Sequence, residues 1–198
     1  MSKHYSKEIA DAISQFLTKD GWKYQFSEQA GIFHFAVELE GQISKMSFVL
    51  EVHEKDFNVY GFIPISAKPG DKEMLLRISE FLHRANYGLR NGNFELDFQD
   101  SEIRYKTFVE CDGLTAPTHE MICNSIYCVA VVFERYSKGI AKIIWADMDA
   151  KTAVAICENP CEDVQPEEAE EVSQARTLDD DIAEFADGAG RSRLRIMQ

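Results

Sequence analysis

Residues 93–106 read NFELDFQDSEIRYK, and this stretch indicates the architecture of the whole chain. Apolar and polar residues alternate on both sides of Asp100-Ser101, which predicts two antiparallel strands joined by a two-residue turn. The expected cross-strand pairs are apolar on one face and oppositely charged on the other: Phe98–Ile103 and Leu96–Tyr105, then Asp97–Arg104 and Glu95–Lys106. Because both faces agree, this register is self-consistent.

The segment upstream of the hairpin predicts four more strands. Apolar residues repeat with period two over 24–26, 33–39, 46–52 and 57–63, and polar or glycine-containing turns separate these ranges. Consecutive strands with short connections are usually neighbours in a sheet. We therefore expect an antiparallel meander.

Apolar residues at helical spacing predict three helices, one before these strands and two after them. A first helix is expected over 6–19, with Ser6 as its cap and Gly21 just beyond its end. A second begins after Asp71 and ends near Gly88, and a third covers about 120–145, with Gly139 as a candidate bend. The order of helix, strands, helix, hairpin and long helix predicts an α+β fold with flanking helices on an antiparallel sheet.

The third helix is apolar on most of its circumference. Its large apolar residues include Ile126, Val129, Phe133 and Ile140. Such a helix is either enclosed within its own domain or offers a second face to another chain. We expect the second arrangement, a homodimer in which these four residues contribute to the interface, and internal burial is the alternative.

Charge divides the chain near Asn159-Pro160. The 198 residues carry a net charge of -13, and the segment 158–198 holds most of the excess. Few large apolar residues occur in this segment, which predicts a folded domain over 1–157 followed by an acidic, flexible tail over 158–198. One amphipathic piece, 177–187, could form a short helix with Leu178, Ile182 and Phe185 on one face, suited to a partner.

Composition also excludes classes of partner. A strongly acidic chain lacks the clustered Lys and Arg that phosphate backbones require, so we expect no nucleic-acid binding. No run approaches the length of apolar sequence that spans a bilayer, and the first residues lack the apolar core of a secretion signal. We expect a cytoplasmic protein.

The stretch 78–107 carries a family resemblance. It contains Asn86-Tyr87-Gly88 at a helix end, Gly92-Asn93-Phe94-Glu95 at a strand start, and an acidic turn before Arg104-Tyr105. In these features it resembles the YbjN family, whose members are described as bacterial sensory transduction regulators. The resemblance implies a type III secretion chaperone-like fold, a mixed sheet with flanking helices that commonly dimerises. It implies no catalytic residue.

Metal chemistry is the alternative to a binding role. His34, Glu51 and His53 lie on neighbouring expected strands and could converge on one sheet face as ligands. His119 and Cys123 are spaced i and i+4 on the third helix, with Glu120 beside them, which resembles a zinc-hydrolase helix with one His replaced. The remaining cysteines in strand and helix patterns are typical of buried, reduced thiols.

We therefore expect a non-enzymatic protein-binding or regulatory module that uses no cofactor or metal and binds a protein partner or client. A chaperone of the type III secretion class and a small metal-dependent enzyme are the two alternatives. Fold similarity alone cannot choose among them.

Overall fold

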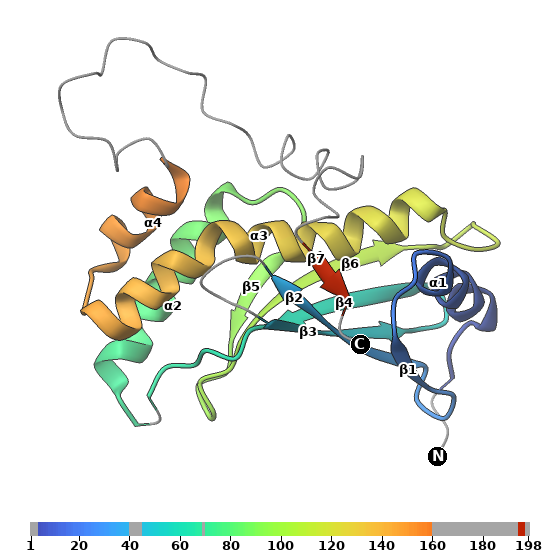
Figure 1. Ribbon diagram of the computed structural model, residues 1–198, viewed down its shortest axis with the longest axis horizontal. Helices are drawn as coiled ribbons and strands as arrows, with labels where there is room; N and C mark the ends of the chain where they lie inside the picture. The colour runs from blue at the N-terminus through green and yellow to red at the C-terminus, as the bar shows by residue number, and fades with distance from the viewer. Residues whose placement is uncertain (1–3, 40–44, 69, 160–193, 197–198) are drawn as a thin grey trace, which may run out of the picture.

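The computed structural model describes residues 4–39, 45–68, 70–159 and 194–196 and shows a two-layer α+β fold. A seven-stranded sheet forms one layer, and helices pack on one of its faces (Figure 1). The expected order of helix, strands, helix, hairpin and long helix is confirmed. A further helix and a further strand follow the long helix.

All strand pairs are antiparallel, and the spatial order is β1-β2-β3-β4-β6-β5, with β7 also paired to β2. The strands are β1 (Tyr24–Ser27), β2 (Ile32–Leu39), β3 (Lys45–Val52), β4 (Asp56–Phe62), β5 (Asn93–Leu96), β6 (Ile103–Glu110) and β7 (Leu194–Ile196). The meander of β1 to β4 is as predicted. The β5–β6 hairpin joins it through β6, so that β5 is an edge strand.

Alternation along the strands determines which face is covered. One residue in two points to the helices, and on β2, β3 and β4 these positions are almost fully buried: Phe33, Phe35, Val37, Met46, Phe48, Leu50, Val52, Phe57 and Val59. Burial of aromatic and branched side chains of this size stabilises the fold by about 1.5–3 kcal/mol per side chain. The intervening residues make up the other face.

The first two helices begin and end where the sequence predicts. Helix α1 (Lys7–Lys19) is capped by Ser6, whose side chain accepts from the N–H of Ile9. At its end the Trp22 N–H donates to the Leu17 carbonyl, while Gly21 adopts a positive φ of 76°. This is a Schellman motif, which favours glycine at that position. Helix α2 (Lys72–Gly88) is capped by Asp71.

The long helix α3 (His119–Ala146) runs without interruption, and α4 (Ala150–Glu158) packs against it and against α2. Gly139 does not break α3. It is instead a point of close approach, because a Cβ there would lie 2.6 Å from the Phe81 ring and 2.7 Å from the Cys157 sulfur.

Burial corrects the expectation for the apolar faces of α3. Ile126, Val129, Phe133 and Ile140 are each 0% exposed within a single chain, so they are not available to a partner. The sheet covers one side of α3, while α1, α2 and α4 pack around it. Internal burial, the alternative considered from the sequence, is the arrangement found. An interface between chains would have to use other residues.

The register predicted for the β5–β6 hairpin is wrong by two residues. The structure pairs Leu96 with Ile103 and Glu95 with Arg104. The connection is longer than two residues because the carboxylates of Asp97 and Asp100 accept from the N–H groups two residues further on. These Asx turns leave Phe98 in the loop, 58% exposed. A shift of two residues keeps every side chain on its face, so alternation could not distinguish the two registers.

Apart from residues 158 and 159, the tail expected over 158–198 is described only at 194–196. Leu178, Ile182 and Phe185, with the expected helix over 177–187, lie outside the described residues. The described part, β7, pairs with the end of β2, and the sequence analysis did not predict this strand. Among the helices that the structure describes, none is long and apolar enough to cross a membrane.

Candidate functional site

The uncovered face of the sheet is the candidate site. On β4 and β6 it presents Asn58, Tyr60 and Phe62 beside Phe108, Lys106 and Arg104, since the register places these residues opposite one another. Phe108 is 51% exposed. In Figure 1 the helices lie on the other side of the sheet, and no described helix packs on this face.

An aromatic and basic cluster occupies the middle of this face. The guanidinium carbon of Arg104 lies 4.8 Å from the centre of the Tyr60 ring, and the Lys106 ammonium lies 5.7 Å from it. The Arg104 Nε also donates to the Glu95 carboxylate at 2.6 Å. Cation–π and ion-pair contacts of this kind hold flat side chains against the sheet and leave them available for contact.

The electrostatic environment of Tyr60 reflects this crowding. Partial burial raises the pKa of the Tyr60 phenol above its usual value, and the Glu51 carboxylate raises it further. Because the neutral form persists, the hydroxyl remains a hydrogen-bond donor throughout the physiological range. The ring of Phe62 lies 6.5 Å from that of Tyr60, centre to centre, and extends the aromatic surface along β4.

A polar cluster lies at the other end of the same face. The amide nitrogen of Asn58 is 3.1 Å from the His53 Nε2, and the same ring nitrogen is 3.8 Å from Glu51 and 4.0 Å from Asp56. All four groups belong to β3, β4 and their connection. Asn58 is 7% exposed, so the imidazole and the two carboxylates cover it from solvent.

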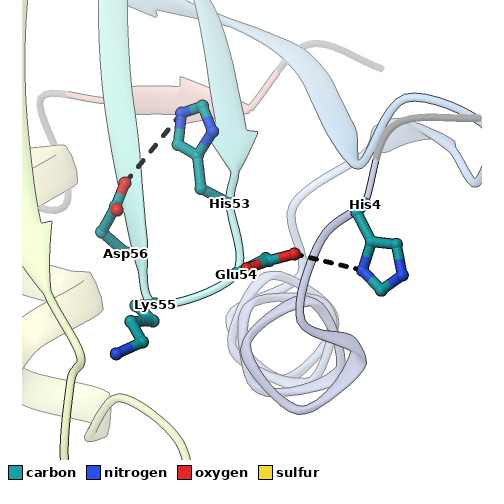
Figure 2. Close-up of a pocket in the computed structure, with 5 residues that line it drawn as sticks. All are labelled: His4, His53, Glu54, Lys55 and Asp56. Carbon is teal, nitrogen blue, oxygen red and sulfur yellow. Dashed lines mark ion pairs between the residues drawn. The ribbon is translucent and has the colours of Figure 1, made fainter.

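A shallow depression of about 480 Å³ adjoins this cluster. It is lined by His4, His53, Glu54, Lys55 and Asp56. Figure 2 shows the Glu54 carboxylate directed to His4, 3.3 Å away, and the His53 ring on the other side of the hairpin, directed to Asp56. Because the two imidazoles belong to separate ion pairs, they do not converge on a shared ligand.

The predicted metal sets are not assembled. His34 lies opposite Val49, so it is two residues along the sheet from Glu51 and four from His53, a distance of about 13 Å at 3.3 Å per residue. His119 instead packs on the Phe16 ring at 4.9 Å, and Cys123 is buried. Within the described ranges, no three His, Cys, Asp or Glu side chains are grouped as a metal site.

The cysteines of the described residues are packed in the interior. Cys111, Cys123 and Cys128 are buried, as the sequence predicts, Cys157 is buried as well, and no disulfide joins any of the four. Burial raises the pKa of the Cys111 and Cys157 thiols to about 11. A thiol with such a pKa is a poor nucleophile at neutral pH, because its thiolate fraction is small.

Charges on the open face are separated along the strands. Arg104 and Lys106 lie toward one end beside Phe62 and Tyr60, where Glu95 pairs with Arg104, whereas Glu51, Asp56 and Glu110 lie toward the other. The arrangement is therefore dipolar. A surface of this kind is complementary to a copy of itself turned through 180°.

The open-face residues were not predicted from the sequence, although a signal for them was present. Tyr60 and Phe62 have the opposite parity to Phe57 and Val59, which period two places on the covered face. Two aromatic residues on the outward parity of one strand are larger apolar groups than a solvated face requires. That pattern could have identified the surface.

No family model, curated protein or solved structure matched this chain, so the resemblance to the YbjN family stays a prediction and the site is interpreted from its own geometry.

Proposed function

We propose that this chain is a non-enzymatic protein-binding module that acts as a homodimer, with the open sheet face as the contact between the two copies. The observation that supports this proposal is the aromatic cluster of exposed Phe108 with half-buried Tyr60 and Phe62, which has oppositely charged groups toward its two ends. Exposed aromatic rings framed by polar groups are typical of interface centres.

The size of the face fits a dimer. Six strands of four to eight residues form it, and strand spacing and rise give a footprint of about 600 Å² in projection. A stable interface buries about 800 Å² of accessible surface on each partner, and a pleated surface with side chains has more accessible area than its projection. The open face therefore has the size that a stable dimer needs.

A two-fold axis near Tyr60 brings unlike charges together. With the axis crossing the strands between the rows of Tyr60 and Asn58, Arg104 of one copy lies over Glu110 of the other, and Lys106 lies over Phe108. Each contact occurs twice because the interface is isologous. The opposite orientation, with the strands of the two copies running in the same sense, would place like charges together and is disfavoured.

Light scattering coupled to size-exclusion chromatography tests the dimer. The unmodified chain is expected to give a mass near twice 22.6 kDa. In the Phe108→Glu variant a carboxylate would be desolvated in the centre of the interface, so dimerisation should weaken by at least about tenfold. Raising the ionic strength should also weaken it, because paired surface charges are screened.

The matched control is Leu76→Glu. Leu76 is 64% exposed on α2, in the layer away from the open face, and the substitution adds the same charge to the protein. The control should retain the dimer. A monomeric unmodified chain at high concentration, or equal weakening by both variants, would overturn the proposal.

A further inference from the structure

The outer edge of β2 is divided between two short strands that come from distant parts of the chain. Strand β1 pairs with residues Ile32–Phe35, and β7 pairs with Val37–Leu39. Figure 1 shows β7 beside β2. Between α4 and β7 lie 35 residues, 159–193, so this pairing is made by a segment remote in sequence.

Trp22 explains why β1 leaves part of the edge open. Its side chain is 6% exposed, and its ring lies 5.0 Å from Phe35 and 6.5 Å from Phe48. Because the chain turns from α1 into the core at Trp22, β1 begins at Tyr24, opposite Phe35. The backbone groups of β2 beyond Phe35 therefore need another partner, since an unpaired edge is a template for a further strand.

The register of β7 indicates which residues can pair with this part of the β2 edge. It pairs Glu38 with Arg195, and it places Leu194 and Ile196 opposite Leu39 and Val37. Glu38 is exposed, whereas Val37 is fully buried. The strand that pairs with Val37–Leu39 therefore has the sequence pattern apolar, basic, apolar.

We propose that residues Val37–Leu39 of β2 form a strand-acceptor site for an extended peptide segment of a partner protein with the pattern apolar–basic–apolar. In this structure the site is filled by Leu194–Ile196 of the same chain. The main-chain ladder of β2 supplies the affinity, and Glu38 selects a basic residue at the central position.

The chain's own strand then acts as a competitor for the site. Docking of β7 is intramolecular and does not depend on protein concentration, so a partner segment binds only the fraction of molecules in which β7 has left. If that fraction is about one tenth, the apparent affinity for the partner is reduced about tenfold. The acceptor groups are the main chain at the edge of β2, whereas the proposed dimer contact is centred on β4 and β6, so the two proposals are tested separately.

A variant of the full chain with β7 released provides the test. In antiparallel pairs, alternate residues direct their N–H groups to the neighbouring strand, so either Arg195 or Ile196 donates to β2. Combining Arg195→Pro with Ile196→Pro removes that donor whichever of the two it is. The probe is a fluorescent peptide of residues 190–198, GRSRLRIMQ, measured by anisotropy. We expect it to bind the released variant about tenfold more tightly than the unmodified chain.

Charge exchange separates recognition from nonspecific attraction of a basic peptide to an acidic protein. Glu38→Arg in the released variant should weaken binding at least about fivefold, and a peptide carrying Arg195→Glu should bind this variant better than the original peptide does. Glu28→Arg, an exposed charge reversal beside β1, is the matched control and should bind as the released variant does.

Two results would overturn the proposal. One is equal peptide affinity of the released and unmodified chains. The other is a dimer of the unmodified chain that dissociates on release of β7, because the occupant would then be a second copy. A different result would refute the proposed open-face dimer, namely that Phe108→Glu does not weaken dimerisation.

Discussion

The substitution Gly139→Ala tests how closely α3, α2 and α4 are packed. A Cβ at this position would lie 2.6 Å from Phe81 Cε2 and 2.7 Å from Cys157 Sγ, well inside the 3.4 Å at which ordinary contact begins. Phe81 is 0% exposed and Cys157 is 3% exposed, so neither can move into solvent. The methyl group therefore has to separate α3 from its neighbours.

Two opposing effects determine the size of the change. Alanine favours a helix interior over glycine by about 1 kcal/mol. Overpacking of a filled core costs about 1–3 kcal/mol, and the upper end applies because two buried groups must move. The free energy of unfolding should therefore fall by about 2 kcal/mol, which for a chain of this size lowers the Tm by roughly 4–8 °C.

Urea denaturation followed by circular dichroism measures this change, and Gly88→Ala is the matched control. Gly88 is the last residue of α2, and the nearest atom to a Cβ there is a Glu158 oxygen at 3.9 Å. With space available, the helix preference for alanine should raise the free energy of unfolding by up to about 1 kcal/mol. Replacement of glycine by alanine is thus expected to lower the free energy of unfolding at position 139 and to raise it at position 88.

A second measurement locates the effect of Gly139→Ala. Cys157 is buried beneath the contact, so its reaction with a disulfide reagent at pH 8 should accelerate in the Gly139→Ala variant and not in the Gly88→Ala control. Equal or greater stability of Gly139→Ala relative to the unmodified chain would refute the reasoning, since it would show that α4 does not pack on α3 at this distance.

Three further results are expected. Asn86→Ala should lower the free energy of unfolding by about 1–3 kcal/mol in urea denaturation, because the Asn86 amide both donates to and accepts from the backbone of Phe94 and its loss leaves buried groups unpaired. Asp149→Ala should cost about 1 kcal/mol by the same assay, since this side chain caps α4. The contribution of the Cys111 and Cys157 thiols to stability should be constant below about pH 9 and fall between pH 9 and 11, because they ionise in the unfolded chain before the folded one. Replacing both by Ala should make the alkaline decline shallower in denaturation curves recorded against pH.

Local signals in the sequence predicted most of the fold. The caps at Ser6 and Asp71 fixed the starts of two helices, and period-two alternation placed the meander. These features depend on residues near one another in the chain, where propensity and capping act.

The remaining features depend on contacts between distant segments. The hairpin register was decided by the side chains of Asp97 and Asp100 bonding to backbone, which competes with a two-residue turn. The surroundings of α3 required knowledge of where α1, α2 and α4 pack. Strand β7 has three residues and gave no periodic signal of its own.

The candidate site was the least predictable part. Its chemistry comes from the neighbouring strands β4 and β6, whose residues Tyr60 and Arg104 are far apart in sequence. Sequence spacing suggested that His34 would meet His53, whereas the antiparallel register separates them. A register error of a few residues is enough to create or remove such a cluster.

The divided edge of β2 has a consequence for synthesis in the cell. Everything that the sheet needs apart from β7 is encoded before residue 160, so the ribosome adds at least 34 more residues before that strand can pair. At about 5–20 residues per second this takes roughly 2–7 s. During that interval a nascent chain that has already folded its body would present an open sheet edge, and a chaperone or an early partner would meet the strand-acceptor site before the chain's own strand does.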